Sequence, residues 1–261
     1  IEHGTHFLNL LNSLQINLES LDQGVASYVQ SYYQVDQAYR KFVYYYRRSG
    51  HKNLFGDLFE QICNQYTNNY LLQLGDRWQS LVDESADWKI PDSISQKKFF
   101  DHFVRRKFLD KKKKVYVIIS DALRFEAGEE FCNLVKQEDK YDATLSHMIT
   151  GLPSYTQLGM ASLLPNSSIE IKDDKGSTVI VDGVKSGGTA NRDKILKSAT
   201  NNRAMAIQAK DLMEMKSSEC KQLCGDHDLI YVYHNRIDDT GHSQKTEREV
   251  FDATETAFGE L

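Results

Sequence analysis

From residue 115 onward, short apolar runs that suit β-strands alternate with stretches that suit α-helices. This pattern constrains the fold more than any other feature of the sequence. We predict strands at 115–120, 143–148, 204–208 and 229–234, and helices near 126–137, 156–163, 189–199 and 246–258. Residues 167–183 alternate around a DDKG turn, which predicts an inserted antiparallel hairpin. Such alternation is typical of an open, mostly parallel sheet with helices on both faces.

The preceding residues 1–92 are predicted to form an α-helical region. Their apolar residues recur at intervals of three and four, as in Phe7, Leu8, Leu11 and Leu14. The tyrosine- and arginine-rich stretch YYQVDQAYRKFVYYYRR (32–48) has two interpretations, helix packing with hydroxyls at the surface or a nucleic-acid stacking surface, and we favour packing.

Residues 93–114 are predicted to be a connector, with a helix at about 95–109 that leads into the basic run RRKFLDKKKK (105–114). Seven of these ten residues are Lys or Arg. Basic residues suit the C-terminal end of a helix, and we favour a solvated helix end over a phosphate-contacting patch.

The charges of the two parts of the chain differ. Residues 1–114 hold 16 Lys and Arg against 13 Asp and Glu, whereas the remainder holds 16 against 24. An acidic part suits a cation site built from carboxylates better than a non-specific contact with nucleic acid.

The remaining composition indicates a cytoplasmic protein. There is no run of eighteen apolar residues, so we predict no membrane span. The four cysteines are sparse and are interpreted as reduced thiols. The first residues, IEHGTHF, resemble neither a signal peptide nor a natural start, and we expect this chain to be a piece of a longer protein.

Polar residues follow three of the apolar runs. The run VYVIIS, expected to be a core strand, ends on Asp121, the run at 143–148 is followed by Ser154 and Thr156, and the last by His234, Asp238, Asp239 and His242. In open α/β sheets, ligands bind at the carboxyl ends of the strands. A carboxylate, a hydroxyl at a helix start and an Asp/His cluster at one edge are the components of a metal-assisted phosphoryl-transfer site.

Each component also has a purely structural interpretation. Asp121 could be a helix N-cap, Thr156 could cap its helix by bonding the amide of Gly159, and His234 could be a core histidine. Residues 238–241 could be a plain polar turn. A dinucleotide site is excluded because no glycine-rich turn follows the run at 115–120.

Three short motifs of the sequence resemble the PglZ domain of the BREX phage-defence system and, through it, the alkaline phosphatase superfamily. They are IISDALRFE, LPSYTQLGMASLLP and YVYHNRIDDTGH, and in the helical region YRKFVYYYRR and NNYLLQLGDRWQSLVD resemble the segment that precedes that domain. The resemblance implies an alkaline-phosphatase-like α/β domain over residues 115–261, with the C-terminal part of the fold missing.

The resemblance also implies roles for individual residues. Asp121 matches the first metal ligand, and Thr156, in Pro153-Ser154-Tyr155-Thr156, matches the nucleophile, which is also a ligand. Asp238 and His242 match the D-x-x-G-H pattern of the second metal. His234, Ser154 and Arg124 are expected to lie next to these ligands and to orient them without binding the metal themselves.

The expected cofactors are two divalent ions, Zn²⁺ or Mn²⁺, because mixed oxygen and imidazole ligands suit these metals. The superfamily pattern needs a later Asp-His pair and a further His, so this chain is expected to hold an incomplete two-metal site and to be inactive or weakly active alone.

The resemblance implies a metal-dependent phosphatase or phosphodiesterase that works with other proteins of a defence complex. Its substrate is left open between nucleic acid, nucleotide and phosphoprotein, and no membrane partner is expected. The alternative is a non-catalytic scaffold that keeps the phosphatase fold.

Overall fold

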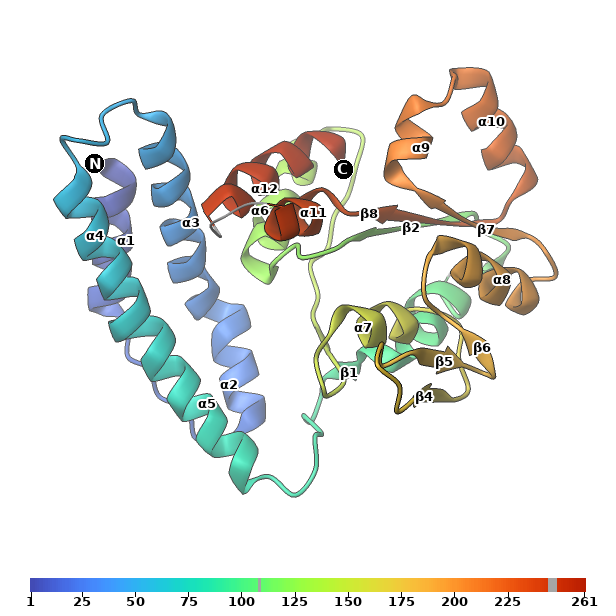
Figure 1. The fold of residues 1–261 in the computed structure, drawn as a ribbon, viewed down its shortest axis with the longest axis horizontal. Helices are drawn as coiled ribbons and strands as arrows, with labels where there is room; N and C mark the ends of the chain where they lie inside the picture. The colour runs from blue at the N-terminus through green and yellow to red at the C-terminus, as the bar shows by residue number, and fades with distance from the viewer. Residues whose placement is uncertain (108, 244–247) are drawn as a thin grey trace. The chain divides into compact units, whose positions relative to one another are not determined.

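The computed structural model describes residues 1–107, 109–243 and 248–261, which divide into two compact units (Figure 1). The first unit contains Ile1–Asp92, Leu123–His147 and Ile237–Leu261, and the second contains Ser93–Ala122 and Met148–Arg236. Helices combined with parallel strands confirm the predicted α/β class.

The first unit is helical. Its elements are α1 (Glu2–Ser13), α2 (Leu21–Ser27), the π-helical turn η1 (Tyr28–Tyr32), α3 (Tyr33–Arg48), α4 (Gly56–Gln65), the π-helical turn η2 (Tyr66–Leu71), α5 (Leu72–Glu84), α6 (Phe125–Lys136), α12 (Arg248–Glu260) and most of α11 (Arg236–Ser243). The predicted helical region is therefore present. None of the helices in the described ranges is both long enough and apolar enough to cross a membrane.

Aromatic residues form much of the core of this unit. Tyr39 of α3 stacks on Tyr66 of η2 with ring centroids 3.7 Å apart, and Tyr32 and Tyr70 are buried. Tyr45, in contrast, is 48% exposed. Most of the tyrosine-rich stretch therefore packs, as predicted, because the 3.6-residue period of α3 turns its apolar faces toward neighbouring helices.

Two polar clusters lie within this aromatic core. The carboxylate of Asp36 accepts hydrogen bonds from the hydroxyls of Tyr28 (2.7 Å), Tyr66 (2.7 Å) and Tyr70 (3.2 Å). One turn along α3, the buried Arg40 binds glutamates of α6 and α12. These bonds join helices that are far apart in the sequence.

The second unit contains a three-stranded parallel sheet. Its strands are β2 (Val115–Ser120), β8 (Leu229–His234) and β7 (Ala204–Gln208), in the order β2-β8-β7, and Val115 pairs with Leu229 and Ser120 with His234. Helix α8 (Thr189–Ala199) lies on one side of the sheet, and α9 (Ala209–Glu214) and α10 (Ser217–Asp226) lie on the other (Figure 1). The predicted sheet with helices on both faces is confirmed.

The remaining elements of this unit are short. An antiparallel sheet contains β4 (Ile169–Ile171), β5 (Val179–Val181) and β6 (Val184–Lys185), which confirms the predicted hairpin and adds a strand. A parallel pair joins β1 (Ile94–Ser95) to β3 (Met148–Ile149). The helical pieces are η3 (Gln96–Lys98), η4 (Phe100–Arg105), η5 (Leu109–Lys111) and α7 (Thr156–Ser162).

Several expectations differ from the structure. The strand predicted at 143–148 is wrong for 143–147, because within the described ranges this segment pairs only through Met148 and Ile149, with β1. The connector is not one helix but the short turns η3, η4 and η5. Helices α9, α10 and α11 were not predicted. The helix predicted at 246–258 corresponds to α12, and residues 246–247 lie outside the described residues.

Strand β2 is not a core strand with two buried faces. It stands at the edge of the sheet, and Tyr116 and Ile118 are 51% and 50% exposed while Val117 between them is buried. Successive side chains of a strand point to opposite faces, so only one face of β2 is packed.

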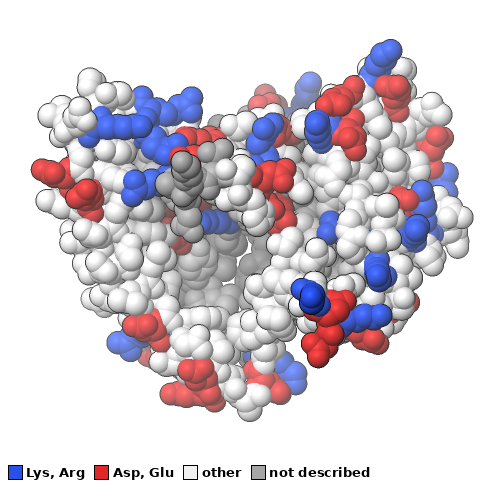
Figure 2. All heavy atoms as spheres, viewed as in Figure 1, with Lys and Arg blue, Asp and Glu red and all other residues white. Residues whose placement is uncertain are grey.

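Figure 2 shows how charge is distributed over one face of the molecule. Lys and Arg side chains gather over the end of the first unit where α3 finishes, and Arg47 and Arg48 form its last turn. Over the visible part of the second unit, both signs are interspersed.

Candidate active site

Asp121 lies directly beyond the carboxyl end of β2. Its amide donates to the carbonyl of His234 (2.9 Å), so the pairing of β2 with β8 continues one residue past the strand. Its carboxylate accepts a hydrogen bond from the amide of Ala122 (3.0 Å), which has a left-handed φ of 64°. The N-cap of α6 is Arg124, so the interpretation of Asp121 as a helix N-cap is wrong.

His234 ends β8 beside Asp121. Only 3% of it is exposed, and its Nδ1 lies 2.9 Å from Oγ of Ser120 on the paired strand. A hydrogen bond to one ring nitrogen fixes the orientation of an imidazole. His234 can therefore hold the end of β2 in place through its contacts with Ser120 and Asp121.

Ser154 and Thr156 are exposed residues around the start of α7. The amide of Gly159 bonds to the carbonyl of Tyr155 (3.0 Å), and the Thr156 hydroxyl makes no hydrogen bond within the described ranges. The interpretation of Thr156 as a cap for Gly159 is therefore wrong, and its hydroxyl is open to an incoming group.

Asp238 and His242 belong to the first unit, on helix α11. Residues 236–243 form a helix rather than a plain polar turn, and Nε2 of His242 lies 3.5 Å from Oδ2 of Asp238. Residues four apart share one face of a helix, whereas the neighbouring Asp239 is exposed on another.

Arg124, also in the first unit, begins α6, and its guanidinium lies 5.6 Å from the ring centroid of Phe251 on α12. The structure thus brings together Asp121 and His234 in one unit and Asp238 and His242 in the other.

The side chains of Asp121, Asp238 and His242 offer oxygen and nitrogen atoms that suit a divalent metal. A carboxylate and an imidazole one helical turn apart are a common pair of ligands for Zn²⁺ or Mn²⁺. Among the residues that the structure describes, no three His, Cys, Asp or Glu side chains converge on one point. All four cysteines are free thiols, as expected.

The sequence analysis did not identify two residues near the same sheet edge. Arg192 of α8 is only 8% exposed, and its guanidinium lies 4.6 Å from the ring centroid of Tyr233 on β8. The Tyr233 hydroxyl is buried and has no hydrogen-bond partner among the described residues. No local pattern marks these residues, apart from the glycines at 187 and 188 that precede α8.

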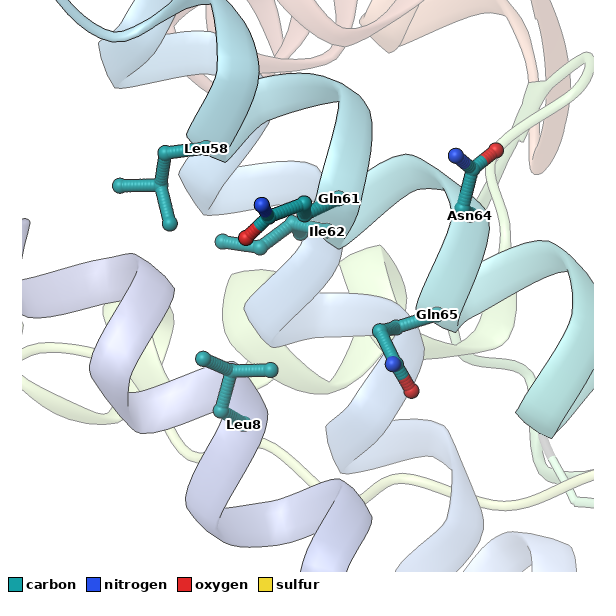
Figure 3. Close-up of a pocket in the computed structure, with 6 residues that line it drawn as sticks. All are labelled: Leu8, Leu58, Gln61, Ile62, Asn64 and Gln65. Carbon is teal, nitrogen blue, oxygen red and sulfur yellow. The ribbon is translucent and has the colours of Figure 1, made fainter.

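Two cavities of the structure lie elsewhere. One, of about 250 Å³, is lined by leucine, isoleucine and amide side chains of α1 and α4 (Figure 3): Leu8, Leu58, Gln61, Ile62, Asn64 and Gln65. The other, of about 370 Å³, lies among η4, β5, β6 and α8. Neither lining includes a residue of the candidate active site.

The chain is similar to known proteins of one family. Residues 99–261 match the model of the "BREX system PglZ alkaline phosphatase-like domain". The chain is 39% identical over 241 residues to alkaline phosphatase-like protein BrxZ of Escherichia coli O9:H4 (strain HS), covering 90% of this chain and 28% of that protein. It is 36% identical over 237 residues to alkaline phosphatase-like protein PglZ of Bacillus cereus (strain H3081.97), covering 90% of this chain and 27% of that protein.

The chain therefore spans little more than a quarter of the length of these relatives. The matched residues contain Asp121, which directly follows β2, and the helices α7 and α11, which carry Thr156, Asp238 and His242. The chain belongs to the family of BREX PglZ alkaline phosphatase-like domains.

Proposed function

We propose that the full-length protein is a metal-dependent phosphoester hydrolase of a phage-defence system, with Thr156 as its nucleophile. The observation that supports the proposal is the hydrogen bond from the Asp121 amide to the His234 carbonyl (2.9 Å), because Asp121 then lies at the carboxyl edge of a parallel sheet, where open α/β sheets usually bind ligands. Membership of an alkaline phosphatase-like family supports the same reaction class.

In this proposal the Thr156 oxygen attacks phosphorus as its proton passes to solvent, and the P–O ester bond breaks as the leaving oxygen takes a proton from water. Water then attacks the phosphothreonine, which releases the phosphate product and restores the Thr156 hydroxyl. The exposed Thr156 hydroxyl, without a partner in the described ranges, is suited to this role. Two bound Zn²⁺ or Mn²⁺ ions would acidify that hydroxyl and neutralise charge on the phosphoryl group. Asp121, Asp238 and His242 are the proposed ligands from this chain.

His234, Ser154 and Arg124 are proposed to support these groups. The bond between His234 and Ser120 holds the end of β8 and supports the position of the neighbouring Asp121. We further propose that the protein acts in the cytoplasm with other proteins of the defence system, on a nucleic acid, nucleotide or phosphoprotein substrate.

The proposal is tested by hydrolysis of p-nitrophenyl phosphate and bis(p-nitrophenyl) phosphate by the full-length protein with Zn²⁺ or Mn²⁺. Thr156→Ala should lower kcat by at least about a thousandfold, whereas Thr156→Ser should keep measurable activity. Ser154→Ala, two residues away and also exposed, should lower kcat much less, because Ser154 is proposed to support the site and not to attack phosphorus.

Metal content separates the enzyme from the scaffold alternative. A purified enzyme should carry about two divalent ions per chain. Protein that binds none and hydrolyses neither ester would support the scaffold. An inactive Ser154→Ala beside an active Thr156→Ala would instead assign the nucleophile to Ser154.

A further inference from the structure

Arg192 carries a buried positive charge that no acidic side chain balances. Only 8% of the residue is exposed, and its Nε donates to the carbonyl of Ser186 (3.1 Å). Within the described ranges its two terminal nitrogens make no ion pair, and their polar contact is a weak one with the Tyr233 hydroxyl. The adjacent carboxylate, Asp193, is already bound to the amide of Ala206 (2.9 Å) and to Lys197 (2.7 Å). Burying an uncompensated charge destabilises a protein, which favours a role in binding an anion.

The contact between Arg192 and Tyr233 leaves the O–H donor of Tyr233 and most N–H donors of Arg192 unused. The guanidinium carbon lies 4.6 Å from the ring centroid, a cation–π contact that needs none of its N–H groups. The Tyr233 hydroxyl is buried and lacks a partner among the described residues. Burial raises the pKa of Tyr233 to about 12, while the guanidinium of Arg192 opposes the rise by its charge and by a weak polar contact with the hydroxyl, so the hydroxyl keeps its proton and can donate it to an acceptor.

Two hydrogen bonds place this pair near the carboxyl edge of the β2-β8-β7 sheet. The first residue of α8, Thr189, is hydrogen-bonded to Gln208, the last residue of β7. Tyr233 directly precedes His234, whose carbonyl binds the amide of Asp121.

The loop before α8 also lies close to α7. A Cβ atom at Gly187 would lie 3.7 Å from Oε1 of Gln157, the residue after Thr156. Arg192 is bonded to Ser186 of the same loop, so the loop connects the surroundings of Arg192 to those of Thr156.

The position of Arg192 within α8 has the same implication. A cation near the start of an eleven-residue helix opposes the helix dipole and is unfavourable in the free protein. An anion bound there would interact favourably with both the guanidinium and the dipole. The position of Arg192 is therefore energetically more favourable with an anion bound than without one.

We propose that Arg192 and the Tyr233 hydroxyl bind a non-bridging oxygen of the phosphoryl group that reacts with Thr156. The nature of the anion rests on the proposed function, whereas the anion site itself rests on the burial and unused donors of this pair. Inorganic phosphate, the product of monoester hydrolysis, carries the same oxygens and is a direct probe.

The test is calorimetric titration of the full-length protein with inorganic phosphate. Arg192→Met should weaken phosphate binding by about tenfold to a hundredfold, the range of one hydrogen bond to a charged group. Arg192→Lys should lose less, because it keeps the charge without the planar fork. Tyr233→Phe removes only the unpartnered hydroxyl, so it should fold normally and still weaken binding severalfold.

Arg203→Met is the matched control. Arg203 belongs to the same unit but is half exposed and paired with Asp228, so phosphate binding should not change. Unaltered binding by both Arg192→Met and Tyr233→Phe, or no binding of phosphate by the unmodified protein, would overturn the proposal.

Hydrolysis separates this proposal from the proposed function. Arg192-dependent phosphate binding in a protein without hydrolase activity would refute the function and leave the anion site in place. Thr156-dependent hydrolysis with an unchanged KM and unchanged phosphate inhibition in Arg192→Met would refute the anion site alone.

Discussion

Replacing Arg40 by methionine should destabilise the first unit by about 3–5 kcal/mol, the usual cost of removing one partner from a buried ion pair. Arg40 and Glu126 are each 1% exposed, and Nε of Arg40 lies 3.0 and 2.9 Å from the two carboxylate oxygens. The other guanidinium nitrogens bind Glu130 on α6 and Glu255 on α12.

The magnitude follows from what remains after the substitution. Lys41 also binds Glu130 and Glu255, so these two carboxylates, about one-fifth exposed, keep a positive partner. Glu126 does not. Burial already raises the pKa of Glu126 while Arg40 opposes that rise, so without Arg40 the carboxyl should protonate at a higher pH. Protonation removes the unpaired charge, and the cost of Arg40→Met should therefore shrink as the pH falls.

The assay is urea denaturation of the chain at pH 7 and pH 5, with Arg47→Met as the matched control. Arg47 is seven residues further along α3 and binds Asp252 (3.0 Å) and Glu249 (3.4 Å) of the same helix, α12, but its side chain is 24% exposed. Its loss should cost no more than about 1 kcal/mol. The reasoning is refuted if Arg40→Met costs no more than Arg47→Met, or if its cost grows from pH 7 to pH 5.

Three further predictions concern the candidate site and the core. Asp238→Asn and His242→Ala should each lower the metal content of the full-length protein, measured by elemental analysis, whereas Asp239→Asn should not, and a metal-free Asp239→Asn would reverse the ligand assignment. Burial raises the pKa of Asp36, so its favourable contribution to stability is fully present below its unfolded pKa and is lost as the pH rises through the folded value. Unfolding of Asp36→Asn should accordingly show a larger deficit against the unmodified chain at pH 4.5 than at pH 7, and an equal deficit at both would contradict this. Ala122→Gly should raise the unfolding free energy by up to about 1 kcal/mol, because φ of 64° suits glycine, and a loss of stability in a thermal melt would disprove the strain argument.

Local sequence patterns predicted the positions of those helices and strands that have a clear periodicity or turn signal. Helix α8 has the predicted bounds, 189–199, and β2, β7, β8 and the hairpin of β4 and β5 lie where alternation and turn residues placed them. The strand prediction for 143–147 was wrong because a strand needs a partner. Which segments pair depends on the fold of the whole chain. The edge position of β2 could not be predicted for the same reason.

The sequence by itself determined which polar residues follow the apolar runs, and the resemblance to the PglZ domain is what selects Asp121, Thr156, Asp238 and His242 among them as predicted site residues. It also determined where most strands and helices lie, because the periods of two and 3.6 residues are local properties of the backbone. Only the tertiary structure decided that α11 is helical and presents Asp238 and His242 on one face. It alone decided that Arg40 is buried with carboxylates whereas Arg192 is buried without one. Burial and charge compensation depend on neighbours distant in sequence, which no local pattern specifies.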